Sequence, residues 1–251
     1  MTDLTGKVVF LTGASRGIGA VTLSRLLEAG ASVVAHTGRT AHTDAALLES
    51  YGPERLYVLG GDLNRPGEAT RLFREAVAWR GRVHVLVNNA GIAPSVTVND
   101  PLSAWAQVWQ ETIQVNLLSV AECCREALLH YQGHQGGMII NIASRAAFRG
   151  DNPDAMHYAA SKGGVVALTR SIARGFARAG VLAYTVAPGW VHTDMAKAYL
   201  AEHAAEIARD IPMGEAAPPG DVAQTVVFLA SGLVPHMTGA TLDINGASYV
   251  H

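Results

Sequence analysis

The chain has 251 residues, of which 49% are apolar and 16% charged, and its formal net charge is −2. This composition supports a large buried core and excludes a disordered chain, and the absence of a long basic run argues against nucleic acid as a partner. No apolar stretch is as long as a membrane span and the N-terminus lacks a signal-peptide pattern, so we expect a cytoplasmic protein that binds no membrane.

Short apolar runs recur along the chain and predict β-strands. They fall at residues 7–12, 32–36, 55–60, 83–88, 138–143, 181–186 and 241–245. Most are separated by stretches with helical spacing, and such alternation indicates a parallel sheet covered on both faces. We therefore predict an α/β fold: a Rossmann-type, doubly wound sheet of seven parallel strands. Residues 1–251 are expected to form a single domain, in which residues of about 190–215 form a helical substrate flap.

A glycine-rich segment, TGASRGIG at residues 12–19, joins the first predicted strand to a helix. Gly13, Gly17 and Gly19 permit a tight turn and let a ligand approach the backbone, while the helix N-terminus offers free N–H groups. The spacing differs from the Gly-x-Gly-x-x-Gly dinucleotide fingerprint, but the glycines have the same physical roles. An ordinary strand–helix turn is the alternative. The position directly after the first strand favours a pyrophosphate-binding turn.

Five further short motifs or single residues follow the glycine-rich segment along the chain. They are NNAG (88–91), Asn116, Ser144, YAASK (158–162) and PG (188–189). With the glycine turn, this set resembles the short-chain dehydrogenases/reductases over nearly the whole chain, in their compact single-domain branch. The 3-oxoacyl thioester reductases are the nearest subgroup. An enoyl-reductase branch of the family spaces its tyrosine and lysine more widely than Tyr158 and Lys162.

The predicted catalytic residues include Tyr158 and Lys162, which lie one helical turn apart and so share a helix face. A nearby ammonium favours a phenolate, so Lys162 is expected to lower the pKa of Tyr158 from its ordinary value of about 10. The resemblance implies that Tyr158 is the general acid/base and that Lys162 also binds the nicotinamide ribose. It further implies that Ser144 donates to the substrate oxygen and that Asn116 holds a water. Taken singly, these residues are more typical of surface pairs, caps and packing contacts; their occurrence together behind the glycine turn favours the catalytic interpretation.

In dinucleotide-binding folds, an acidic residue after the second strand binds the adenine ribose and indicates a preference for NAD. At this place the chain has HTGR (36–39), which contains no acidic residue. Arg16 and Arg39 are suited to a 2′-phosphate, which predicts NADP(H), with NAD(H) as the alternative if both are solvated loop charges. The resemblance implies further cofactor contacts from Gly13, Ser15, Gly17, Ile18, Gly19, Asp62, Leu63, Asn89, Ala90, Gly91, Tyr158, Lys162, Pro188, Gly189, Val191 and Thr193.

The predicted reaction is reduction of a ketone to a secondary alcohol by hydride transfer. The alternatives are an NAD-dependent dehydrogenase of a secondary alcohol or polyol, and a non-catalytic dinucleotide sensor that has no need of the catalytic set. The substrate pocket is expected between residues 145–157 and the flap. Apolar lining is expected from Phe148, Met156, Trp190, Met195 and Tyr199. Arg145 and Arg149 are placed to meet a substrate anion, although solvent exposure explains them as well.

Two further expectations concern partners and metals. His130 and His134 have no evident third ligand, so no metal site is expected. They also stand where a reductase that acts on an acidic acyl carrier protein would have lysine or arginine. Their presence weakens the interpretation that the substrate is delivered by such a carrier protein. The broad apolar faces of residues 104–129 and 155–178 resemble the family's paired helices, so we expect a homotetramer, with a dimer as the alternative.

Overall fold

The computed structural model describes residues 2–250, except the side chains of residues 195 and 198. Its strands are β1 (Val8–Thr12), β2 (Ser32–His36), β3 (Leu56–Leu59), β4 (Val85–Asn88), β5 (Gly137–Ile142), β6 (Val181–Pro188) and β7 (Thr241–Ile244). They form one seven-stranded sheet in the order β3-β2-β1-β4-β5-β6-β7, with all neighbouring pairs parallel. The predicted doubly wound α/β fold is confirmed.

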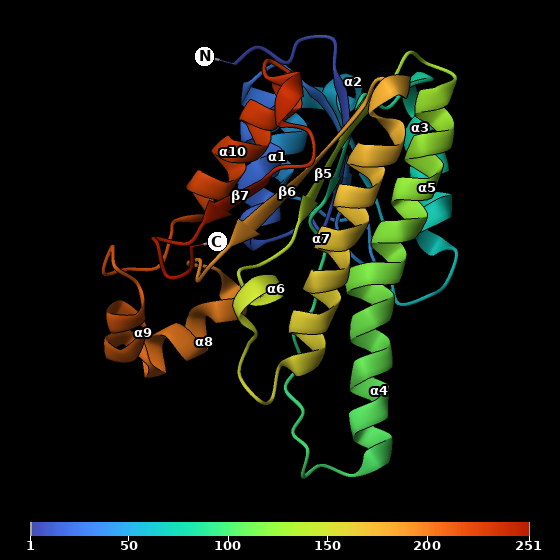
Figure 1. The fold of residues 1–251 in the computed structure, drawn as a ribbon. Coiled ribbons are helices and arrows are strands. Elements are labelled where there is room, and N and C mark those ends of the chain that lie inside the picture. Colours follow the sequence, from blue (N-terminus) through green and yellow to red (C-terminus); the bar gives the residue numbers. More distant parts are fainter. Residues whose placement is uncertain (1, 251) are drawn as a thin grey trace.

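Helices cover both faces of the sheet (Figure 1). One face packs against α1 (Gly17–Glu28), α2 (Ala45–Arg55) and α10 (Pro219–Ser231), and the other against α3 (Glu68–Arg80), α5 (Ser119–Gln132) and α7 (Met156–Phe176). Side chains alternate accordingly in β1, where Phe10 joins the second layer while Val9 and Leu11 join the first. No helix within residues 2–250 is long and apolar enough to cross a membrane.

The long helix that precedes β5 changes its winding partway. It comprises α4 (Leu102–Ile113), a π-helical turn η1 (Gln114–Leu118) and then α5. Figure 1 shows α4 extending beyond the edge of the sheet, where it packs beside α7. Single π-turns occur often at functional sites because they redirect one side chain. Here the turn contains Asn116, one of the predicted catalytic residues.

The carboxyl ends of the strands meet at one edge and place the predicted site residues there. Gly13 follows β1, Asp62 follows β3, Asn89 follows β4, Ser144 follows β5 and Gly189 follows β6. The strand order reverses between β1 and β4, which makes this edge a topological switch point. Ligands of open α/β sheets bind at such a point.

The segment between β6 and α10 contains α8 (Asp194–Glu202) and α9 (Ala204–Asp210), so helices form where they were predicted. The stretch between Ser144 and Tyr158 contains a short helix, α6 (Ala146–Arg149), which the sequence did not indicate. Arg145 and Arg149 each place Nη1 2.9 Å from Asp210 Oδ2. These ion pairs connect α9 to the residues that follow Ser144. The remaining short helices are η2 (Ala177–Ala179) and η3 (Pro235–Met237).

Three histidines lie at the opposite edge of the sheet. His84 Nδ1 accepts a hydrogen bond of 2.9 Å from Val8 N, and His130 Nε2 accepts one of 3.2 Å from Val83 N. The rings of His130 and His134 lie with their centroids 4.1 Å apart and their planes tilted by 32°. Across the described residues, no group of three His, Cys, Asp or Glu side chains is arranged to hold a metal ion. The two neutral acceptors instead hold the starts of β1 and β4.

We expect His84 to make the folding stability of the protein depend on pH in the acidic range. Burial, and then the charges of Arg82 and Lys7, lower the pKa of His84 to about 4, whereas the unfolded value is about 6.5. Since the unfolded chain binds the proton more readily, stability falls as the pH drops from about 6.5 towards 4. In His84→Asn, an amide oxygen replaces the acceptor without titrating, so its melting temperature should fall less steeply over this range. Equal slopes for the two proteins would contradict the assignment.

Candidate active site

The glycine turn has no room for side chains. A Cβ on Gly13, whose φ is +69°, would lie 2.8 Å from the Cα of Ala90, and a Cβ on Gly19 would overlap the carbonyl oxygen of Gly13. A Cβ on Gly17 would lie 3.2 Å from Thr193 Cγ2. Asn89 Nδ2 donates to the carbonyl oxygens of Thr12 and Gly13, at 3.0 and 2.9 Å. The exposed backbone at the start of α1 therefore fits a pyrophosphate.

The residues predicted to face the adenosine half lie around the ends of β2 and β3. Arg39 has a side chain that is 79% exposed, and its Nε lies 3.0 Å from Asp62 Oδ2. Ser15 and Arg16 are exposed at the turn, whereas Leu63 is buried. The structure thus brings Arg39 to the predicted adenine-contacting residue Asp62, a pairing that the sequence did not indicate.

Asn116 is fully buried and holds the chain that follows β4. Its Oδ1 accepts a hydrogen bond of 2.8 Å from Ile92 N, and its Nδ2 donates to Ile92 O at 2.9 Å. Nδ2 also lies 3.2 Å from Ser161 Oγ, which donates to the carbonyl oxygen of Tyr158 at 2.7 Å. Ser161 was missed from the sequence. It lies inside the YAASK motif and connects the π-turn to α7.

The predicted catalytic residues converge beside Gly91, which itself was predicted to contact the cofactor. A Cβ on Gly91 would lie 3.4 Å from Asn116 Oδ1 and 3.5 Å from Lys162 Nζ. Lys162 is 4% exposed, donates to Ile142 O at 2.8 Å, and places Nζ 5.7 Å from the centroid of the Tyr158 ring. The side chain of Ser144 lies near the hydroxyl of Tyr158 and lowers the pKa of this phenol. Four residues from three segments, η1, the loop after β5 and α7, thus lie close together.

Burial, rather than Lys162, dominates the acidity of Tyr158. Desolvation raises the pKa of Tyr158 to about 12; the Ser144 hydrogen bond lowers it, and the charge of Asp151 raises it further. Desolvation also lowers the pKa of Lys162 to about 8. The predicted lowering of the phenol pKa is therefore not found. The reason is that Lys162 is buried and Tyr158 is half-buried, and removal from water disfavours the phenolate and the ammonium alike.

The loop after β6 closes the site beside the glycine turn. Gly189 N donates to Ile244 O at 2.9 Å, and a Cβ on Gly189 would lie 2.8 Å from the Cβ of Asn245. Val191 is buried, and Thr193 contacts the glycine turn at Gly17. Pro188 ends β6. The predicted nicotinamide-side residues are thus brought next to the turn, and the chain around Asn245 supports them.

The predicted substrate side is formed by α6 and α8. Trp190 and Tyr199 stack with ring centroids 5.0 Å apart, and the guanidinium of Arg145 lies 5.9 Å from the Trp190 ring. Arg145 is only 9% exposed, so the interpretation of this side chain as a solvated charge is wrong; its ion pair with Asp210 keeps it buried. The side chain of Met195 lies outside the described residues.

Phe148 and Met156 do not join that aromatic stack. The ring of Phe148 stacks on that of Tyr249, with centroids 5.9 Å apart, which places it against the C-terminal segment. Met156 is 39% exposed at the start of α7. The apolar lining predicted from these residues is thus divided between two neighbourhoods.

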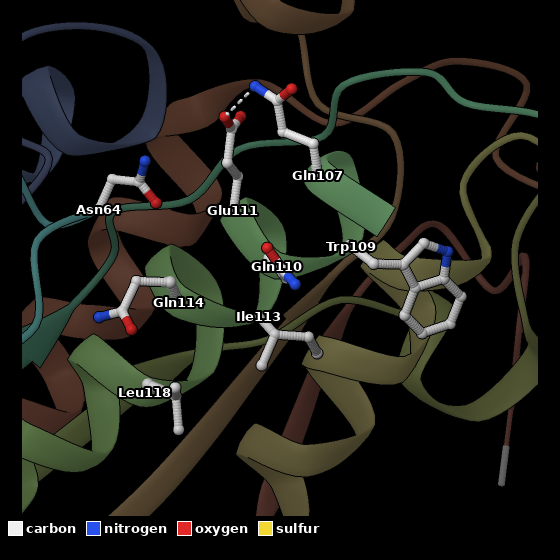
Figure 2. Close-up of a pocket in the computed structure, with 8 residues that line it drawn as sticks. All are labelled: Asn64, Gln107, Trp109, Gln110, Glu111, Ile113, Gln114 and Leu118. Carbon is white, nitrogen blue, oxygen red and sulfur yellow. Dashed lines mark hydrogen bonds between the residues drawn. The ribbon is translucent and has the colours of Figure 1, made fainter. Parts of the chain in front are cut away.

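Two cavities lie outside the catalytic cluster. One of about 580 Å³ is on the outer side of α4 and η1, and Figure 2 shows its lining, with Gln107 Nε2 donating to Glu111 Oε1 at 2.9 Å. Trp109 and Leu118 supply apolar surface there. The other, of about 830 Å³, lies between α10, β7 and the C-terminal segment. Neither is lined by any of the four predicted catalytic residues.

Comparison with known proteins agrees with this geometry. A family model described as "Enoyl-(Acyl carrier protein) reductase" matches residues 13–247. The chain belongs to the short-chain dehydrogenase/reductase family and is an NAD(P)-dependent oxidoreductase that acts on CH–OH groups.

Two curated relatives and one solved structure are similar to the chain over nearly its whole length. The chain is 34% identical over 248 residues to the 3-oxoacyl-[acyl-carrier-protein] reductase FabG of Vibrio cholerae serotype O1, with 99% of each chain covered. It is 32% identical over 246 residues to the FabG of Staphylococcus aureus, with 97% of this chain and 98% of that protein covered. Among solved structures, a putative short-chain alcohol dehydrogenase from Sinorhizobium meliloti 1021 matches with a TM-score of 0.90 and 30% identity, with 98% of each chain covered.

Proposed function

We propose that this protein is an NADP(H)-dependent ketoreductase that converts a 3-oxoacyl thioester, or a similar ketone, to the secondary alcohol. The observation that carries the proposal is the convergence of Ser144, Tyr158, Lys162 and Asn116 beside Gly91, next to a glycine turn that fits a dinucleotide. The relatives named as 3-oxoacyl-[acyl-carrier-protein] reductases support the substrate class.

Each residue has a defined part in the proposed reaction. When bound, the nicotinamide cofactor supplies the hydride that the ketone carbon accepts. Ser144 donates a hydrogen bond to the ketone oxygen, and the hydroxyl of Tyr158 gives this oxygen its proton. Lys162 supplies positive charge beside the phenol, and Asn116 fixes the backbone at Ile92 against α7. A phenol with a pKa of about 12 holds its proton at neutral pH, which suits an acid in the reductive direction.

The preference for NADP(H) is proposed from Arg16 and Arg39. Arg39 is already held at the adenosine side by Asp62, and a guanidinium is well shaped to bind a phosphate. We expect Arg16→Ala and Arg39→Ala each to raise the Kd of NADPH by about tenfold or more, because charge-assisted hydrogen bonds contribute about 1.5–3 kcal/mol. The Kd of NADH should change little. Arg25→Ala, at the far end of α1, is the control, and an equal effect on both cofactors would contradict the preference.

The segment of about residues 190–215 is proposed as the substrate flap. Its ring stack at Trp190 and its ion pair at Asp210 both reach the residues that follow Ser144. Ordering of this segment over the site would exclude water from the reacting ketone.

The proposed function is tested by initial rates of NADPH oxidation, with NADH in parallel. A suitable panel contains an acetoacetyl thioester, a β-keto ester, a cyclic ketone, a diketone and a sugar-like ketone. The proposal expects turnover to be fastest with the thioester and NADPH. Turnover of other ketones alone would change the substrate class, and turnover with NADH alone would remove the roles proposed for Arg16 and Arg39.

We also propose a homotetramer in the cytoplasm. The outer face of α4 and η1 carries exposed or half-exposed apolar side chains around the cavity of Figure 2, including Trp109 and Leu118. A second copy of the chain is the proposed cover for this face. Light scattering that gives a monomeric mass would contradict the assembly, and a dimeric mass would support the dimeric alternative.

A further inference from the structure

One buried histidine touches the glycine turn and has no part in the proposed chemistry. His36 is the last residue of β2 and is 2% exposed. Its Nδ1 accepts a hydrogen bond of 3.3 Å from Gly13 N, and its Nε2 lies 3.0 Å from Gly61 O. Its backbone oxygen also accepts from Ala14 N at 2.8 Å. A single residue therefore binds the turn after β1 and connects it to the end of β3.

The partners of the ring define its protonation state. Gly13 N–H only donates, so Nδ1 must be an unprotonated acceptor, and Gly61 O only accepts, so Nε2 must carry the proton. A neutral imidazole satisfies both contacts, and an imidazolium satisfies only the second. Protonation of His36 would place an N–H against the N–H of Gly13 and break the contact with the turn.

Two peptide groups meet at the Cα of Gly13, at the tight point of the turn. In the first, the N–H of Gly13 donates to His36 Nδ1 and the carbonyl oxygen of Thr12 accepts from Asn89 Nδ2. In the second, the carbonyl oxygen of Gly13 accepts from Asn89 Nδ2 and lies where a Cβ on Gly19 would be. Loss of the imidazole contact leaves the first peptide bonded only at its carbonyl oxygen, so it can rotate, because glycine has few steric barriers. The free N–H groups that follow at the start of α1 would then lose their common direction.

We propose that His36 is a positioning residue for the dinucleotide: its neutral imidazole holds the glycine turn in the binding conformation, and its protonation weakens cofactor binding. This inference rests on the proposed function of the turn. It gives the protein a cofactor affinity that falls in acid, independently of the catalytic residues.

The charged groups around the ring are compatible with a His36 that is neutral at neutral pH and protonated in acid. Burial lowers the pKa of His36 below its ordinary value; the Gly61 hydrogen bond and Glu68 raise it, and Arg71 lowers it. Glu68 and Arg71, both on α3, neutralise one another in an ion pair of 2.8 Å. The remaining charged or titratable groups on the adjoining turn and loops are Arg16, Arg39, His42, Asp44, Asp62 and Arg65, and Arg39 is paired with Asp62. The ring thus stays neutral at neutral pH and gains its proton only in acid.

The test is calorimetric titration of wild type and His36→Asn with NADP⁺ and NAD⁺ between pH 8 and 5, since the oxidised cofactors withstand acid. An asparagine keeps an acceptor for Gly13 without titrating. For wild type, the Kd of both nucleotides should rise as the pH falls into the acidic range, with a slope that approaches about tenfold per pH unit. His36→Asn should lose this rise with NAD⁺, which has no titrating 2′-phosphate.

The possible outcomes distinguish a failure of the role proposed for His36 from a failure of the proposed function. Equal pH slopes for the two proteins would overturn the role of His36 while leaving the proposed function intact. Failure of wild type to bind either nucleotide at pH 8 would overturn both. If His36→Asn does not fold, the ring of His36 is followed by NMR in wild type: its pKa should fall when NAD⁺ binds, and an unchanged pKa would refute the inference.

Discussion

Tyr158→Phe should lose almost all turnover while it keeps the cofactor. The substitution removes only the hydroxyl that is proposed to protonate the ketone oxygen, and general acid catalysis contributes about 10²–10⁴-fold to a rate. The half-buried ring itself is kept, so the fold and the cofactor site should be unchanged. We expect kcat to fall by about this factor and the Kd of NADPH, measured by fluorescence, to change less than about twofold.

Tyr57→Phe is the matched control for this variant. Its hydroxyl donates to Glu75 Oε1 at 3.0 Å, between β3 and α3, and lies outside the catalytic cluster. The control should keep wild-type kcat. Near-normal kcat in Tyr158→Phe, or an equal loss in both variants, would remove Tyr158 from the catalytic role.

Lys162→Met should also be severely impaired, and its pH profile should differ from that of wild type. The substitution removes a buried cation and the hydrogen bond to Ile142 O, and loss of one such electrostatic group costs about 10²–10³-fold in kcat. Because the pKa of Lys162 is lowered to about 8, reduction by wild type should slow as the pH rises through about 8 and the ammonium is lost.

Lys162→Arg tests that explanation, because a guanidinium stays protonated well above this range. Lys162→Met and Lys162→Arg should both lack the decline near pH 8, with Lys162→Arg the more active of the two. A decline at the same pH in both variants would show that another group causes it.

The fold was predictable because short stretches of sequence are enough to indicate its strands and its glycine turn. The runs that became β1 to β6 are largely apolar, as strands covered by helices on both faces must be, and the glycine turn was recognisable from its position after the first of them. The predicted catalytic residues could be chosen because their motifs stand in the order of the family. Their convergence beside Gly91 follows from the parallel topology, which brings the strand ends to one edge.

The unpredicted features depend on contacts between distant segments. The raised pKa of Tyr158 results from burial, which residue spacing does not reveal. Arg145 looked like a solvated charge because its partner, Asp210, lies 65 residues further along the chain. The π-turn at Asn116 and the contact of His36 with Gly13 likewise need the folded chain. In each case, the packing of neighbouring segments decides the chemistry of the side chain.

The most direct test of the proposed reaction follows the hydride itself. NADPH carrying deuterium at C4 of the nicotinamide would be incubated with the protein and an acetoacetyl thioester, and with a crotonyl thioester in parallel, and the products analysed by mass spectrometry. The proposed function predicts a 3-hydroxy product with one deuterium on C3, and no reduction of the crotonyl double bond. Deuterium in a saturated product from the crotonyl thioester alone would show an enoyl reductase and contradict the proposal.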